Sequence, residues 1–318
     1  MSTAERQVSE DEDGQRLDRW FSRHYPGLSH GRLEKLLRTG QVRVDGRRVK
    51  AGHRVAPGQQ VRVPPEAAEG KAAAEPRPAP VRERDARALR ATVLYRDDAV
   101  LVLNKPAGLA VQGGSGLARH LDGMLDALRF EAPERPRLVH RLDKDTSGIL
   151  VLARTARAAQ ALTRAFREGS VEKTYWAVVA GVPEPRQGRI ELALAKRPGP
   201  RGERVRADDE GRRAVTEYRV IDRAGRDVAW VEFRPLTGRT HQVRAHAAAL
   251  GTPILGDGKY GRRQAFLDKM GLSGRLHLHA RKVRLPRPDG GELHLKAPPP
   301  KPFVDTLAAL GFAVDEAG

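Results

Sequence analysis

The sequence contains no cysteine, and this absence excludes disulfide bridges, thiolate catalysis and Cys-ligated zinc. It also removes any sign of an oxidising compartment, so the cytoplasm is the expected location. No run of 18 or more apolar residues occurs, and residues 1–14 are polar and acidic, without the apolar core of a signal peptide. We therefore expect a protein that is neither secreted nor embedded in a membrane.

Acidic residues are scarce relative to basic ones. The chain of 318 residues contains 58 Lys and Arg against 40 Asp and Glu, which gives a formal charge of +18. Such an excess attracts polyanions before any specific contact forms, so nucleic acid is the leading class of partner. An arginine-rich composition that only solubilises the surface would explain part of the same excess. The length favours one large core with a smaller module, or two comparable domains.

Residues 14–64 have the pattern of a small module of two helices and a sheet. The apolar spacing after Arg16 predicts a short helix that ends before Pro26-Gly27. A second helix is expected between an N-cap at Ser29 and a C-cap at Gly40. Alternating valines follow, interrupted by a two-residue hairpin signal. The module is therefore expected to be compact.

This module carries half of the charge excess of the chain. Residues 14–64 contain 12 Lys and Arg but only 3 Asp and Glu, a formal net charge of +9. A run of charge is usually a solvated face, but here a basic helix face leads into a basic hairpin, which suits a surface that follows phosphates. Two stretches, Arg16-Leu17-Asp18 and Val42-Arg43-Val44-Asp45-Gly46, resemble the S4 RNA-binding domain. The candidate RNA-binding residues are Arg16, Arg32, Lys35, Arg38, Arg43, Arg47 and Arg48.

Beyond this module the composition changes twice. Residues 65–91 are rich in Ala, Pro, Glu and Arg, which cannot build a core, so a linker is expected there. Residues 92–318 contain apolar strand patterns interspersed with helical stretches at 117–128 and 156–166, which predicts an α+β domain. A short apolar helix near Leu307 is expected to pack on that domain.

The polar loop His140–Gly148 leads directly into an apolar strand, and polar groups at the mouth of a strand are typical of a site. A serine hydrolase would need Gly-x-Ser-x-Gly before a helix, which Ser147 does not satisfy. Asp143 and Asp145 could form a carboxylate pair, but this remains a minor option. The histidine pairs 241/246 and 277/279 could suggest zinc, yet no His-Glu-x-x-His occurs. A salt-bridged turn is the plain structural alternative.

The motifs of the second domain resemble those of the RluA-type pseudouridine synthases. His140–Gly148 has every fixed position of the signature H-R-L-D-x-x-T-S-G. Further blocks match along residues 93–300 and include N-K-P-x-G, K-x-Y and T-G-R-x-H-Q-I-R-x-H. They lie at residues 104–108, 172–175, 237–246, 251–261 and 278–280. The resemblance implies a mixed, mostly antiparallel central sheet flanked by helices and loops, and a reaction that needs neither cofactor nor metal.

The resemblance also implies roles for individual residues. Asp143 is the expected nucleophile, acting at C6 of the uracil, at C1′ of the ribose, or by assisting glycosidic elimination. A neighbouring cation should keep this carboxylate ionised, with Arg244 favoured and Arg239 as the alternative. Tyr175 is expected to pack against the base and to serve in proton transfer at C5, although an ordinary core aromatic is also possible.

The target base is expected to flip out of the RNA, with Arg141 filling the vacated space. An ion pair between Arg141 and Asp145 is the alternative for that arginine. The residues expected to contact or flip the substrate are His140, Arg141, Arg239, His241 and Gln242.

The expected partner is RNA, and 23S rRNA or a large-subunit precursor is favoured by resemblance to the RluC and RluD enzymes. A tRNA or snRNA target, a non-catalytic ribosome-assembly protein and a DNA-binding regulator are the alternatives, and a monomer is expected. Two departures from the family pattern concern substrate detail. Gln112 stands where the family commonly has His, and residues 197–211 form an unassigned loop.

Overall fold

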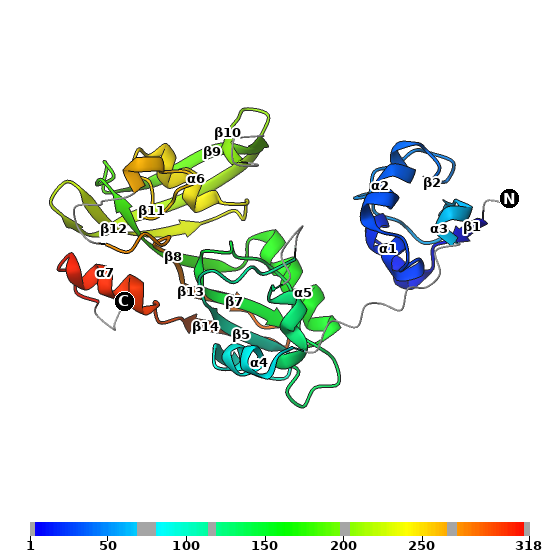
Figure 1. Cartoon of the computed structure of the whole chain (residues 1–318), viewed down its shortest axis with the longest axis horizontal. Coiled ribbons are helices and arrows are strands. Elements are labelled where there is room, and N and C mark those ends of the chain that lie inside the picture. The colour runs from blue at the N-terminus through cyan, green and yellow to red at the C-terminus, as the bar shows by residue number, and fades with distance from the viewer. Residues whose placement is uncertain (1–3, 69–80, 114–118, 198–203, 266–271, 315–318) are drawn as a thin grey trace. The chain divides into compact units, whose positions relative to one another are not determined.

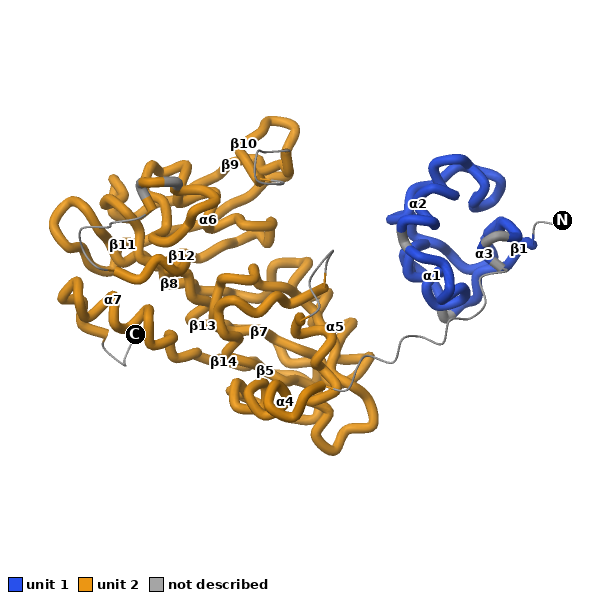
Figure 2. Tube along the Cα trace, in the orientation of Figure 1, with its two compact units in different colours: residues 1–80 blue, residues 81–318 orange. Residues whose placement is uncertain are grey.

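A computed structural model describes residues 4–68, 81–113, 119–197, 204–265 and 272–314. The chain forms two compact units, residues 1–80 and 81–318 (Figures 1 and 2). Across these described ranges, no helix is long and apolar enough to cross a membrane. Of the expected linker at 65–91, residues 69–80 lie outside the described residues.

The N-terminal unit contains the two predicted helices and a small antiparallel sheet with strand order β1-β3-β2. Ser29 caps α2 as predicted, because its side chain accepts a hydrogen bond from the backbone N–H of Arg32. Leu17, Trp20 and Phe21 are buried on one face of α1. The elements are β1 (Ala4–Gln7), η1 (Glu10–Glu12), α1 (Leu17–His24), α2 (His30–Arg38), β2 (Arg43–Val44), β3 (Gln60–Val63) and α3 (Pro65–Ala68).

The segment before Gly14, which the sequence did not assign to the module, is part of this unit. Strand β1 pairs with β3, and Glu12 is only 3% exposed. The Glu12 carboxylate accepts hydrogen bonds from Trp20 Nε1 at 2.9 Å and from the backbone of Ser9 at 3.1 Å, and it contacts His24. One buried acid therefore ties the start of the chain to helix α1.

The second unit has an 11-stranded sheet with the order β10-β9-β11-β12-β8-β13-β7-β5-β4, to which β14 and β6 add at β13 and β7. All described pairs are antiparallel except β7 with β13, so the predicted mixed, mostly antiparallel sheet and the α+β class are confirmed. The strands are β4 (Val93–Arg96), β5 (Val100–Lys105), β6 (Arg137–Leu138), β7 (Ser147–Ala153), β8 (Glu172–Ala180), β9 (Gln187–Arg197), β10 (Arg204–Ala207), β11 (Arg212–Ala224), β12 (Val228–Pro235), β13 (Leu278–Pro286) and β14 (Glu292–Lys296).

Helices cover this sheet, with α5 beside β7 and α6 over the strands β9 to β12 (Figure 1). Helix α4 falls within the stretch predicted as linker, and it packs on the second unit through buried Ala86 and Leu89. Of the helix predicted over 117–128, residues 117–118 lie outside the described residues, and Asp122–Leu128 forms the 3-10 helix η2 instead of an α-helix. The helices are α4 (Glu83–Arg90), η2 (Asp122–Leu128), α5 (Ala156–Glu168), α6 (Gln242–Ala249), η3 (Arg262–Ala265) and α7 (Lys301–Ala309).

The parallel junction of β7 and β13 brings together two segments that are far apart in the sequence. Ser147 lies opposite His279, and the Ser147 hydroxyl donates to His279 Nδ1 at 2.9 Å while His279 Nε2 donates to the carbonyl of Ala297. Gly148 has a φ of 107°, and a Cβ there would lie 2.3 Å from the carbonyl oxygen of Ala280. Only glycine fits this crossing, which places the preceding polar loop at the sheet.

The unassigned loop at 197–211 contains a described strand. Residues 204–207 form β10, which pairs antiparallel with β9 at the edge of the sheet. Residues 198–203 lie outside the described residues.

Candidate active site

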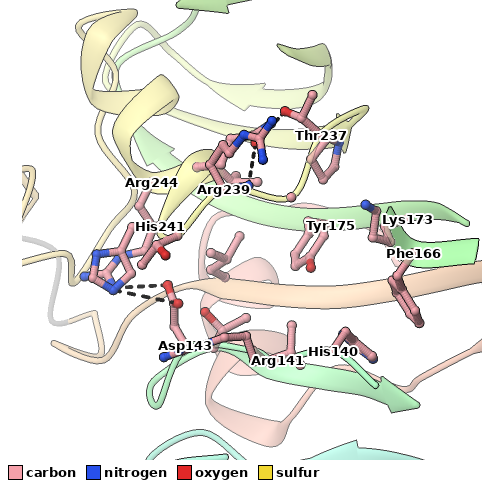
Figure 3. Close-up of a pocket in the computed structure, with 18 residues that line it drawn as sticks. His140, Arg141, Asp143, Phe166, Lys173, Tyr175, Thr237, Arg239, His241 and Arg244 are labelled. Atoms are coloured by element: carbon pink, nitrogen blue, oxygen red, sulfur yellow. Dashed lines mark hydrogen bonds and ion pairs between the residues drawn. The ribbon is translucent and has the colours of Figure 1, made fainter. Parts of the chain in front are cut away.

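A cavity of about 270 Å³ opens where several of the motif blocks converge (Figure 3). The loop before β7, strand β8, and the segment that joins β12 to α6 supply most of its walls. Its polar and aromatic lining residues are His140, Arg141, Asp143, Thr146, Phe166, Lys173, Tyr175, Thr237, Arg239, Thr240, His241, Gln242 and Arg244. All eight residues expected at the catalytic and substrate site therefore line one cavity.

Asp143 lies beside the guanidinium of Arg244. Arg244 Nη1 is 3.3 Å from Asp143 Oδ2, and the Asp143 side chain is 18% exposed, so the carboxylate faces the cavity. Arg239 instead donates from Nε to the carbonyl of Arg213 at 3.1 Å. Of the two arginines considered as the partner of Asp143, Arg244 makes the contact.

Arg244 is held by Asp257, a residue to which the sequence analysis gave no role. Arg244 Nε and Nη2 donate to the two oxygens of Asp257 at 2.8 and 2.9 Å, and Asp257 also accepts from the backbone of Lys259 and Tyr260. Burial opposes the charge of Arg244, but the hydrogen bonds and charges of Asp257 and Asp143 raise its pKa above the usual value. This guanidinium therefore stays protonated, and the block at 251–261 was the signal that could have identified its partner.

His241 has a left-handed backbone conformation with a φ of 52°, and it is the N-cap residue that precedes helix α6. Its Nδ1 shares a 2.8 Å hydrogen bond with the Tyr260 hydroxyl, and its Nε2 lies 3.7 Å from Asp143 Oδ1. Burial lowers the pKa of His241 to about 4, the charge of Asp143 opposes this shift, and the charge of Arg244 adds to it. The ring is therefore neutral near pH 7. A non-glycine residue in this conformation is strained, which is common at functional sites.

Tyr175 lies on β8, between β12 and β13, at a point where the register of β13 shifts between Ala280 and Lys282. Such bulges often redirect side chains next to active sites. Burial and then the charge of Asp143 raise the pKa of the Tyr175 phenol, so the phenol is protonated at neutral pH. Figure 3 shows its ring between Asp143 and Lys173.

The other predicted substrate residues occupy different environments. His140 stacks on Phe166 with ring centroids 4.2 Å apart, and its Nε2 accepts from the backbone of Val151. Burial lowers the pKa of His140 to about 3, and the nearby charge of Lys173 adds to this. Arg141 is exposed, and within the described residues it makes no ion pair with Asp145.

Gln242 is buried, and its amide is fully occupied. Its Oε1 accepts from the Thr237 hydroxyl and the backbone N–H of Arg239, and its Nε2 donates to Val215 and Thr216. Such a network fixes the loop before α6 rather than offering free groups to a ligand. Gln242 was expected to contact substrate, and its position suits it to hold the loop that carries Arg239 and His241.

Lys105 of the N-K-P-A-G motif is completely buried. Its Nζ donates to the carbonyls of Pro106 and Leu109 at 2.9 Å and of Lys144 at 3.0 Å. Burial lowers the pKa of Lys105 to about 8, against the opposing charges of Asp145 and Asp143. Lys105 therefore joins its own turn to the loop that carries Asp143.

The histidines considered for zinc are engaged otherwise. His246 and His277 are hydrogen-bonded to the hydroxyls of Thr216 and Thr306. In the part of the chain that the structure describes, no group of three or more His, Cys, Asp and Glu side chains could hold a metal ion.

In the N-terminal unit, two predicted RNA-binding residues are held by local bonds. Arg16 pairs with Asp18 at 2.6 Å, and Arg43 donates to the carbonyls of Gly40 and Gly46. The others, Arg32, Lys35, Arg38, Arg47 and Arg48, are exposed.

Comparisons with known proteins agree with this geometry. Residues 99–249 match the RNA pseudouridylate synthase family, and residues 15–61 match the S4 domain. The ribosomal large subunit pseudouridine synthase C of Escherichia coli K12 is 38% identical over 299 residues, covering 92% of this chain and 91% of that protein. Its namesake from Haemophilus influenzae is 37% identical, covering 90% of this chain and 88% of that protein.

A solved structure supports the same assignment for the second unit. The human RNA pseudouridylate synthase domain containing 4 is 33% identical with a TM-score of 0.62, and the match covers 73% of this chain and 97% of that one. The chain therefore belongs to the RNA pseudouridylate synthase family and is an RNA pseudouridine synthase with an S4 domain.

Proposed function

We propose that Asp143 is the nucleophile of the isomerisation. The observation that carries this proposal is a series of paired charges at the cavity. Asp143 faces the open space and is paired with Arg244, and buried Asp257 secures the charge of Arg244. An ionised carboxylate can attack and later depart, and it needs no cofactor. Asp143 acts at C1′ or C6, or assists elimination; each route needs the same ionised group.

Other cavity residues are assigned supporting roles. Tyr175 carries a protonated phenol beside the base and is positioned to exchange a proton near C5. Arg141 is exposed at the cavity wall, where its side chain is free to replace a flipped base in the RNA stack. Arg239, His241 and His140 shape the cavity around the nucleotide.

The proposed substrate is 23S rRNA or a large-subunit precursor. Relatives that match about nine-tenths of the chain are named as synthases of the ribosomal large subunit, and the S4 unit carries a formal charge of +9 at residues 14–64. Such a charge suits a large structured RNA. With this substrate, we propose that the enzyme acts in the cytoplasm and as a monomer.

The test is to map pseudouridines by carbodiimide adducts and reverse-transcription stops. Ribosomal RNA and tRNA lacking pseudouridine are incubated with the wild type, with Asp143→Asn, or with Asp145→Asn as a matched control in the same loop. We expect stops in 23S rRNA with the wild type and the control, and a loss on the order of 10³-fold or more with Asp143→Asn. Equal stops with Asp143→Asn would reject the nucleophile, and stops only in tRNA would reject the proposed substrate.

A further inference from the structure

Lys173 is a cation inside the active cavity without an assigned task. It lies on β8 two residues before Tyr175, and residues two apart on a strand point to the same face. The side chain lines the cavity, and Figure 3 shows it beside Tyr175 and Phe166. Lys173 therefore faces the space that the nucleotide occupies.

No protein group compensates the charge of Lys173. Across the described residues, its amine makes no hydrogen bond or ion pair, whereas buried Arg244 is held by Asp257 and buried Lys105 by three carbonyls. Burial lowers the pKa of Lys173, and its charge in turn depresses the pKa of His140. The Lys173 side chain is partly buried and lines the open cavity, so a ligand that displaces water there would have to supply an acceptor for the amine.

The walls near Lys173 indicate which part of the nucleotide lies there. The stacked rings of Phe166 and His140 and the ring of Tyr175 form flat, largely apolar surfaces. Such surfaces fit a planar base rather than a phosphodiester. Asp143 lies on the other side of Tyr175, where the ribose and the glycosidic bond must be for reaction (Figure 3). The base then extends towards Lys173.

We propose that Lys173 donates a hydrogen bond to a carbonyl oxygen of the uracil and stabilises the detached base. This proposal rests on the proposed function and deepens it. When the C1′–N1 bond breaks, its electron pair stays on the base and spreads from N1 to O2 and O4. This charge is consumed when C5 bonds to C1′ and, in the route through C1′, the Asp143 carboxylate leaves that carbon. The C5 proton is then lost and N1 takes up a proton, so the net change is an isomerisation. A fixed cation beside a carbonyl oxygen favours this anion more than the neutral base, so it accelerates the reaction.

The first experiment compares single-turnover rates on an rRNA fragment that contains a uridine modified by the wild type. Lys173→Met should slow the reaction by about 10²–10³-fold, as for the loss of one preorganised donor, while RNA affinity changes by less than about threefold. Lys296→Met is the matched control, because Lys296 is exposed on β14 of the same sheet. Thermal unfolding of each variant verifies that it is folded.

The second experiment identifies the atom. The fragment is made with uridine, 2-thiouridine or 4-thiouridine at the target, because sulfur is a weaker acceptor than oxygen. We expect sulfur at one of the two positions to lower the rate of the wild type but to have little further effect on the rate of Lys173→Met. Sulfur at the other position should change the rates of both proteins equally. Lys173→Gln, which keeps a donor but loses the charge, should be slow yet still sensitive to that position.

The outcomes separate the inference from the proposed function. No activity of the wild type on the uridine fragment would overturn both. An active wild type whose two thio effects are unchanged in Lys173→Met would overturn the role of Lys173 alone. A loss confined to salt-dependent RNA affinity would assign Lys173 to a phosphate and would also overturn it.

Discussion

At the level of single residues, the charges of the site form a series from Asp143 through Arg244 to Asp257. The outer carboxylate is 18% exposed, whereas the Asp257 side chain is fully buried. The inner pair holds the arginine in place, and the outer carboxylate remains accessible to substrate. The two acids thus differ in accessibility: Asp143, the proposed nucleophile, is open to the cavity, and Asp257 is buried and supports Arg244.

Replacing Asp257 should affect both stability and activity. Asp257→Asn removes the buried charged partner of the Arg244 guanidinium and leaves only Asp143 at the cavity, and breaking such a buried pair costs about 3–5 kcal/mol. Urea unfolding measures this loss, and the isomerisation rate should fall because Arg244 is no longer fixed beside Asp143. Asp305→Asn is the control, because its pair with Lys301 is exposed and worth less than about 1 kcal/mol. Equal losses of unfolding free energy and of rate in Asp257→Asn and Asp305→Asn would contradict the support of Arg244 by Asp257.

The sequence predicted which residues meet at the cavity better than it predicted their tasks. Motif order placed Asp143, Tyr175 and Arg244 in one site, because the resemblance carries information about contacts between distant residues. It could not show that Gln242 is saturated by internal hydrogen bonds, that Arg16 pairs with Asp18, or that Asp257 holds Arg244. Those partners depend on how the chain is folded.

At the level of elements, the contact between β7 and β13 determines where Asp143 lies. The apolar strand at 149–152 was predicted, but its parallel neighbour could not be, since alternation in one strand does not specify its partner. The helix α4 was also missed, because only Ala86 and Leu89 of that polar segment are buried. In both cases the decisive contact lies outside the segment.

Gly148 allows a direct test of this contact. Gly148→Ala places a Cβ against backbone atoms of Ala280 that cannot move aside, in addition to the strain of a positive φ. We expect a loss of more than about 3 kcal/mol of unfolding free energy, and a loss of activity. Gly225→Ala isolates the strain, because its φ is 62° and nothing lies within 4 Å of the new Cβ. Similar unfolding midpoints for the two variants would contradict the close crossing.

At the level of the whole molecule, the charged surface of the S4 unit should govern the response of RNA binding to salt. Each contact between a basic side chain and an RNA phosphate contributes about 0.7–0.9 to the steepness of log affinity plotted against log salt concentration. Each contact that is removed therefore makes this slope shallower by that amount. Lys35→Ala, Arg38→Ala and Arg47→Ala together should thus reduce it by about 2 to 3, as measured by filter binding. Substitution of Arg16, which is paired with Asp18, should change the slope little. An unchanged slope in the triple variant would mean that the RNA-binding surface lies elsewhere.

The two units should also respond differently to acid. In the second unit burial lowers the pKa of His246 and of His279 to about 4, and that of His140 to about 3. Between about pH 6.5 and 4 the unfolded chain therefore binds more protons than the folded one, and the unfolding free energy falls as pH falls. In the N-terminal unit burial is the largest single effect on Glu12 and raises its pKa, but the hydrogen bonds from His24, Ser9 and Trp20 together outweigh it and lower the pKa to about 2. The contribution of ionised Glu12 to the unfolding free energy is lost only below about pH 4.5.

Urea unfolding at pH 7, 6 and 5, followed by tryptophan fluorescence, tests this order, because Trp176 and Trp230 report on the second unit and Trp20 reports on the N-terminal unit. The urea concentration at the unfolding midpoint of the second unit should fall with each step of acidification. The fall should be smaller in His279→Gln and unchanged in His294→Gln, whose side chain is exposed. A midpoint that rises on acidification would contradict the prediction.

The crossing of β7 and β13 also has a consequence for synthesis of the chain. Ser147 and His279 are 132 residues apart, so the loop that carries Asp143 gains its support only after the C-terminal strands have left the ribosome. The N-terminal unit has its entire core within residues 8–67 and emerges first. A nascent chain can thus present its RNA-binding surface before any catalytic centre exists, and chains that stop before β13 cannot assemble one.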